Sequence, residues 1–137
     1  MSGVMTIAIC GSMKHSDRMV AIGKMLEQQG IKVFLPNIGE SSDYDSLTEE
    51  QATEHKSQMI RAHLEKIKKS DAVLVVNEPL KGIDGYIGAN TFLEMGFAYA
   101  LEKKIYVLNP LPEQPNIVEL RGLQSVVLNG DMSRLYE

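Results

Sequence analysis

Short apolar runs alternate with helix-forming segments along most of this chain, and this alternation restricts its fold more than any other feature. Five runs have the length and the β-branched, apolar composition of buried strands: 4–10, 31–35, 72–76, 104–108 and 125–128. Strands that alternate with helices are typical of parallel sheets whose two faces are covered. The sequence therefore predicts an α/β fold, a three-layer open sandwich built on a five-stranded parallel sheet.

Three segments between the strands carry helix signals. The first, 16–30, has Ser16 as a candidate N-cap and ends on a glycine. The second, 48–69, opens with a capping-box pattern and is the longest. The third, 88–101, is apolar on nearly every side. Segment 39–47 is polar and acidic without periodicity, so we expect a loop, which is placed to close over a site as a lid.

Composition limits the possible partners and location. The chain has 137 residues, so we expect 1–137 to form one domain. A net charge of −4 without a basic block disfavours a nucleic-acid polymer. The single cysteine, Cys10, favours a reducing, cytoplasmic setting and is interpreted as a small buried hydrophobe. The longest purely apolar run, 72–76, is far below the roughly 20 residues of a membrane span, and no export signal is visible.

Two strand-to-helix loops, 11–16 and 77–88, mark the expected functional edge of the sheet. Right-handed crossovers place such loops on one edge, and ligands of open α/β sheets bind there. Gly11, Ser12 and Lys14 lie at a helix N-terminus, where free N–H groups favour an anion. Neither GxGxxG nor the P-loop spacing is present, so a plain turn remains the alternative.

The second loop begins at Asn77 and carries several glycines over about a dozen residues. Its alternative is an ordinary surface connection. Loops of this length in compact domains are often functional, which favours a role at the site.

Glu94 is the most informative single residue. It is the only charged residue in 88–101, so its carboxylate is expected to be at least partly desolvated. That environment favours a functional role, but Thr91 to Glu94 also match a capping box, which would give the carboxylate a structural role. His63 lies on the apolar face of the long helix, where a hydrogen-bonded core histidine is more common than a catalyst.

Segments 71–77, 86–100 and 103–108 resemble the nucleoside 2-deoxyribosyltransferase family, including its 2-deoxynucleoside 5′-phosphate N-hydrolase-like members. The resemblance extends to the Gly11-Ser12 turn and is most specific at Glu94-Met95-Gly96. It implies a flavodoxin-like or Rossmann-like sheet of order 2-1-3-4-5. It also implies a homodimer or higher homo-oligomer whose subunits complete one another's sites.

The resemblance implies cleavage or transfer at the N-glycosidic bond of a nucleoside or nucleoside 5′-monophosphate, with Glu94 as the nucleophile. A carboxylate can attack the anomeric carbon and hold a covalent glycosyl intermediate. Neither a cofactor nor a metal is needed for this chemistry. The proposed sugar contacts are Gly88, Asn90 and Thr91, and Asn77 is a further candidate substrate contact. Ser12 and Lys14 are candidates for a 5′-hydroxyl or 5′-phosphate.

His63 stands where the family commonly has an aspartate, so strict 2-deoxyribose transfer does not follow from the resemblance. Histidine can transfer protons near neutral pH, and Asp84 and Tyr86 are the other candidates for that work. Two alternatives remain open. One is a non-catalytic nucleotide-binding or regulatory domain of the same fold. The weaker one is a phosphoribohydrolase that releases cytokinin bases, whose PGGxGT pattern this chain lacks.

Overall fold

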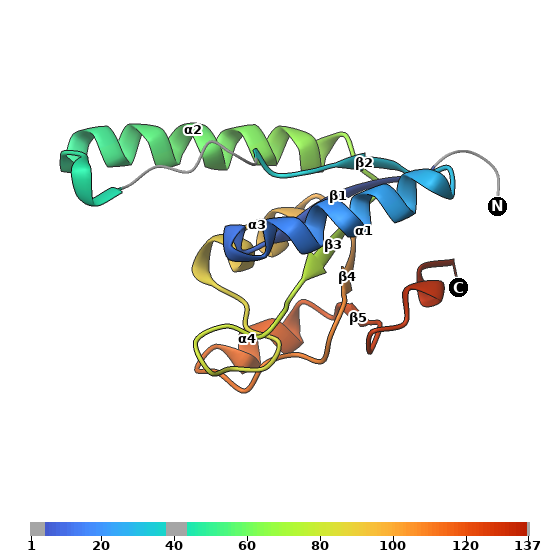
Figure 1. Ribbon diagram of the computed structural model, residues 1–137. Coiled ribbons are helices and arrows are strands. Elements are labelled where there is room, and N and C mark those ends of the chain that lie inside the picture. The colour runs from blue at the N-terminus through green and yellow to red at the C-terminus, as the bar shows by residue number, and fades with distance from the viewer. Residues whose placement is uncertain (1–4, 38–43, 137) are drawn as a thin grey trace.

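A computed structural model describes residues 5–37 and 44–136. Its centre is a five-stranded, fully parallel sheet of order β2-β1-β3-β4-β5 (Figure 1). The strands are β1 (Thr6–Gly11), β2 (Lys32–Phe34), β3 (Ala72–Val76), β4 (Lys104–Val107) and β5 (Val126–Val127). The predicted fold class and strand order are therefore confirmed.

β3 is the central strand, and each of its five residues is buried. Its register pairs Leu74 with Ile9 of β1 and with Tyr106 of β4. Alternate residues of the strands point to opposite faces of the sheet, so the apolar residues form two separate cores. A run that is apolar on both faces is what a central parallel strand requires.

Helices cover both faces of the sheet. On one face, α1 (Ser16–Gln28) packs Met19, Ile22 and Leu26 into the first core. The other face is covered by α2 (Glu49–Lys68), α3 (Ala89–Ala100) and α4 (Ile117–Gly122). Within the described residues, three short 3-10 helices complete the elements: η1 (Met13–His15), η2 (Tyr44–Ser46) and η3 (Met132–Tyr136).

The helix ends agree with the sequence at some positions and differ at others. The capping box at the start of α2 is confirmed, because Thr48 and Gln51 exchange side-chain and backbone hydrogen bonds. Ser16 is not the N-cap that its sequence position suggested. It is the first residue of α1, because Ser12 already caps η1 by accepting a hydrogen bond from the Lys14 N–H.

Part of the predicted lid, 39–43, lies outside the described residues, and 44–46 form η2. None of the helices in the described chain combines the length and the apolar character needed to cross a bilayer.

Candidate active site

A cavity of about 270 Å³ opens where β1 and β2 end. Met13 of η1 and Asn37 after β2 contribute to its wall, and α2 and α3 supply most of the rest. The described lining residues are Met13, Pro36, Asn37, Tyr44, His55, Lys56, Met59, His63, Lys66, Asn90 and Glu94. The cavity thus lies at the edge of the sheet where ligands of this fold class bind.

Glu94 projects from α3 toward α2 and is 8% exposed. Burial raises the pKa of its carboxyl to about 8. A contact with the Cys10 thiol and the positive charges of Lys56 and Lys66 oppose this rise. The ionised carboxylate is therefore a high-energy form in this site.

His63 faces Glu94 from α2 and is 4% exposed. Its Nε2 lies 4.0 Å from Glu94 Oε1, which is longer than a hydrogen bond. Burial, followed by the charge of Lys66, lowers the pKa of His63 to about 4, while the Ile9 backbone acts in the opposite direction. The imidazole is therefore uncharged at neutral pH, so its contact with Glu94 is not an attraction between full charges.

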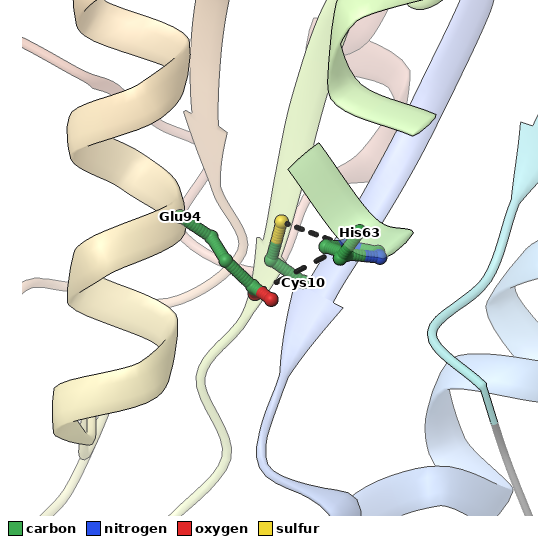
Figure 2. A group of neighbouring side chains, drawn as sticks. All are labelled: Cys10, His63 and Glu94. Carbon is green, nitrogen blue, oxygen red and sulfur yellow. Dashed lines mark hydrogen bonds and ion pairs between the residues drawn. The ribbon is translucent and has the colours of Figure 1, made fainter. Parts of the chain in front are cut away.

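Cys10 completes this buried group at the end of β1. Its Sγ lies 3.5 Å from His63 Nε2, and Figure 2 shows the thiol, the imidazole and the Glu94 carboxylate directed toward one another. Cys10 is fully buried, and burial raises the pKa of its thiol, with the Glu94 charge adding to the rise. The thiol is therefore a polar neighbour of the site, which its interpretation as a plain hydrophobe missed.

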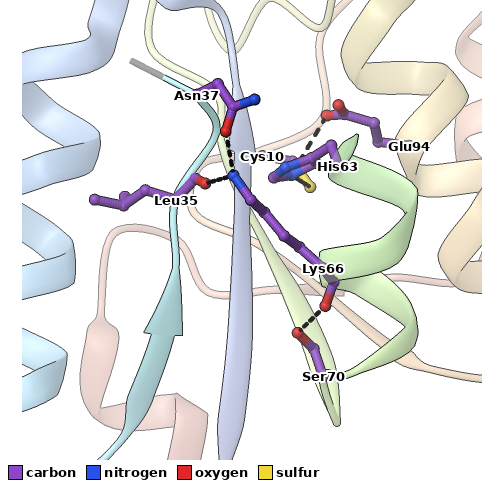
Figure 3. A network of polar contacts seen from close by, with 7 residues as sticks. All are labelled: Cys10, Leu35, Asn37, His63, Lys66, Ser70 and Glu94. Atoms are coloured by element: carbon purple, nitrogen blue, oxygen red, sulfur yellow. Dashed lines mark hydrogen bonds and ion pairs between the residues drawn. The ribbon is translucent and has the colours of Figure 1, made fainter. Parts of the chain in front are cut away.

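Lys66 fixes one wall of the cavity to the sheet. Its Nζ donates hydrogen bonds to the Leu35 carbonyl oxygen at 2.7 Å and to Asn37 Oδ1 at 2.6 Å (Figure 3). These bonds hold α2 against the segment that follows β2. The Lys66 backbone oxygen accepts a further bond from Ser70 Oγ at 2.7 Å, which stabilises the end of the helix.

Tyr44, His55 and Lys56 form a second part of the described wall. The rings of Tyr44 and His55 meet edge to face at 5.6 Å, and Lys56 Nζ lies 5.1 Å from the Tyr44 ring centre. An aromatic face beside an ammonium group suits a ligand that has both a flat ring and polar substituents.

The family model for nucleoside 2-deoxyribosyltransferase matches residues 9–125, which include both loops and all three buried residues of the site. This chain belongs to that family. Its members act on N-glycosidic bonds. No curated protein matches the chain in sequence.

Solved structures of the family share this fold. A 2-deoxyribosyltransferase from Bacillus psychrosaccharolyticus superposes with a TM-score of 0.58 at 20% identity, over 82% of this chain and 78% of that one. A 2-deoxyribosyltransferase from Leishmania mexicana gives a TM-score of 0.52 at 16% identity, over 84% and 70%. At these identities the likeness concerns the fold.

Within this family fold, the start of α3 lies beside the cavity. Gly88 is the N-cap of α3, Asn90 lines the cavity, and Thr91 is 5% exposed. The capping-box alternative for Glu94 is wrong: the helix begins two residues before Thr91, so Thr91 is already inside it. The Glu94 carboxylate therefore has no capping role and is available to the cavity.

The first loop reaches the cavity through a different side chain than expected. Gly11 ends β1, and Ser12 is occupied by the Lys14 N–H at 3.2 Å. Among the described residues of this turn, Met13 lines the cavity, while Lys14 is exposed.

The second loop lies farther from Glu94. Asp84 is exposed and lines another pocket together with Glu78 and Glu113. Tyr86 packs its ring against Gly88, with Lys81 Nζ 5.4 Å from the ring centre. The described lining of the Glu94 cavity includes neither of these two predicted residues, nor Asn77.

Asn77 holds the loops together. Its side-chain amide donates to the backbone oxygens of Gly85, Asn109 and Pro110, and its Oδ1 accepts from the Asn109 N–H at 2.9 Å. The side chain is 1% exposed, so these bonds satisfy a buried polar group.

Proposed function

We propose that this chain cleaves or transfers the N-glycosidic bond of a nucleoside or nucleoside 5′-monophosphate, with Glu94 as the nucleophile. The observation that carries the proposal is a nearly buried carboxylate in the wall of the cavity, facing a neutral histidine. A buried carboxylate with a raised pKa in a cleft is typical of acid-base or nucleophilic sites.

The ionised Glu94 carboxylate attacks the anomeric carbon as the bond from that carbon to the base nitrogen breaks. The electron pair of the broken bond leaves with the base, which takes up a proton from water. A glycosyl ester on Glu94 remains, and water or a second base then displaces it, so the configuration is retained overall. Desolvation favours the attack, because little solvent has to leave the carboxylate first.

His63 is proposed to accept a proton at Nε2. The ring is neutral near pH 7 and lies 4.0 Å from Glu94 Oε1, so a water bound between them would be in reach of both. In the second step this water attacks the glycosyl ester and gives its proton to His63. In this proposal histidine does proton-transfer work at the position where the family commonly has an aspartate.

The other proposed substrate contacts differ in how well their positions relative to the cavity support them. Asn90 lines the cavity together with Glu94, which supports a contact with the sugar, and Gly88 and Thr91 flank it. Ser12 and Lys14 stay candidates for a 5′-hydroxyl or 5′-phosphate, next to the lining residue Met13. Asn77, Asp84 and Tyr86 receive less support, because they lie with the other loop.

A homo-oligomer, with a homodimer as its smallest form, is part of the proposal. α3 leaves Leu93 and Tyr99 at the surface, 41% and 55% exposed, and its C-cap Leu101 is 37% exposed. Apolar side chains that share one surface element are typical of an interface. A second copy packed on α3 would lie close to the cavity and could complete it.

Base release tests the reaction. The protein is incubated with ribo- and deoxyribonucleosides and their 5′-monophosphates, and free base is measured by chromatography. We expect release from at least one substrate and a loss of at least about a thousandfold in Glu94→Gln. Glu102→Gln changes an exposed glutamate just beyond α3 and is the matched control. Full activity in Glu94→Gln would overturn the assignment.

The second candidate function is a non-catalytic nucleotide-binding domain. For both candidate functions the proposed location is the cytoplasm. One observation favours it: with a pKa of about 8, most Glu94 carboxyls are protonated at pH 7. Calorimetry distinguishes the two functions. Saturable binding of a nucleotide without any release of base would support the binding domain.

A further inference from the structure

Cys10, His63 and Glu94 form a group of potential metal ligands. Their sulfur, nitrogen and oxygen atoms all lie within 4.8 Å of one another, and all three residues are buried. They come from β1, α2 and α3, three separate elements, yet their side chains converge on one point (Figure 2). The packed fold therefore positions all three potential ligands without a bound ion.

The spacing is close to that of a bound metal. In a tetrahedral zinc site, bonds of about 2.0–2.3 Å place neighbouring ligand atoms about 3.3–3.6 Å apart. Here the sulfur-to-nitrogen distance is 3.5 Å and the nitrogen-to-oxygen distance is 4.0 Å. An ion at the centre of the group therefore requires only small side-chain movements.

The ligand chemistry selects the ion. A thiolate, an imidazole and a carboxylate suit zinc and related transition ions, whereas magnesium and calcium prefer oxygen ligands alone. With Cys10 and Glu94 ionised and His63 neutral, the two negative charges balance a divalent cation. A buried charge is tolerated only when it is paired in this way.

The positive charges of two nearby lysines disfavour a bound cation. Lys56 and Lys66 place positive charge near Glu94. The Lys66 ammonium is held by the Leu35 and Asn37 oxygens, and the Lys56 ammonium lies over the Tyr44 ring, so both have partners of their own. Their charges still weaken the binding, so we expect zinc to bind more weakly here than in structural zinc sites.

We propose that Cys10, His63 and Glu94 bind a divalent transition-metal ion of the zinc type, with the fourth coordination position directed to the cavity. As the metal binds, the Cys10 thiol proton passes to the buffer, and so does the Glu94 carboxyl proton where that group is protonated. The consequence for catalysis rests on the proposed function: a carboxylate bound to zinc is not available to attack a sugar. Zinc is then a reversible inhibitor that competes for the nucleophile.

Cobalt spectroscopy tests the site without any substrate. The full chain is treated with EDTA, desalted and titrated with Co²⁺, whose thiolate complexes absorb in the near ultraviolet. We expect this band to appear, to be removed by Zn²⁺ and to be unaffected by Mg²⁺. Cys10→Ser keeps the size of the side chain and should lose the band, with zinc binding at least about tenfold weaker. His55→Ala, in the same cavity wall, is the control and should keep both.

The proposal is overturned if the natural protein shows no thiolate band, or if Cys10→Ser, shown to be folded by circular dichroism, binds zinc as tightly. Adding zinc to the base-release assay separates the two claims. Zinc that binds through Cys10 without slowing base release would leave the metal site standing and would contradict Glu94 as the nucleophile.

Discussion

At the scale of single residues, Glu94 is a nearly buried carboxyl in an environment that disfavours its ionised form. The fold gives it a cavity wall, a thiol and a neutral imidazole, but no adjacent cation within the described residues that pairs with it directly. Its pKa of about 8 reflects this burial. A residue that lowers stability in its ionised form is typical of a site selected for function.

Replacing the Glu94 carboxyl should raise the free energy of unfolding relative to the natural protein, and this difference should grow as the pH rises. The folded pKa of about 8 exceeds the ordinary value of 4.5, so between these pH values the unfolded chain releases a proton that the folded chain keeps. The stability that Glu94 provides in its protonated form is therefore lost as pH rises through this window. Glu94→Gln does not titrate at this position, so its advantage in free energy of unfolding should grow by roughly 3–4 kcal/mol between pH 5 and pH 8.

Urea unfolding at pH 5 and pH 8, with EDTA present, measures this difference. Glu102→Gln, which changes an exposed glutamate just beyond α3, is the control. A difference between natural protein and Glu94→Gln that is equal at both pH values would contradict the desolvated carboxyl.

At the scale of elements, the loop after β3 is tied to the loop after β4 by Asn77. These ties bring Gly85 against the Pro110 carbonyl oxygen, at a backbone φ of +70°. Gly82 in the same loop has a φ of +75°, and a Cβ atom added to it would meet no other atom within 4 Å. A side chain at either glycine would therefore suffer similar backbone strain, but only at Gly85 would its Cβ atom also collide with a neighbouring atom.

This pair makes a matched test of the loop packing. Gly82→Ala should cost only its backbone strain, about 1 kcal/mol. Gly85→Ala adds a collision with the Pro110 oxygen and should cost about 3 kcal/mol or more. Thermal unfolding of both variants checks the order. Equal losses would mean that the two loops are not held together as described.

How far the sequence predicts the elements depends on their length. It predicts the central strand, 72–76, with its bounds, because five consecutive buried residues leave a clear pattern. It predicts β5 within 125–128, although that strand has only two residues. It does not predict the six residues of α4, since they are too few to show a helical period. The N-cap prediction for Ser16 is wrong because an earlier serine, Ser12, caps the 3-10 turn that leads into α1.

The site is less completely predictable for a related reason. Glu94 stands out because it is one charge in an apolar helix, which is visible in sequence. Cys10 does not, because its partner His63 lies 53 residues away and only the fold brings them together. Asp84 is grouped with Glu94 in the sequence since both follow the same strand, but its loop turns toward β4.

At the scale of the whole molecule, α3 has two different sides. One side supplies Glu94 to the cavity and Met95 to the core, while the other leaves Leu93 and Tyr99 at the surface. A helix that is apolar nearly all round is usually buried, so a second subunit is the simplest cover for the exposed side. The active site and the proposed interface would then share one helix.

Light scattering during size exclusion checks this arrangement. The natural protein should elute as a dimer or larger assembly, and Leu93→Glu should shift it toward the monomer by placing a charge in the interface. Val118→Glu, which changes a 69% exposed residue on α4, should leave the assembly unchanged. A natural protein that is monomeric at high concentration would contradict the shared interface.

The most direct test of the account is a search for the covalent intermediate on Glu94. The protein is mixed with the substrate that releases base fastest, quenched in acid during turnover, digested and analysed by mass spectrometry. The account predicts one sugar residue attached to Glu94 and none in Glu94→Gln. Rapid base release with the sugar attached to a different residue, or to none, would contradict it.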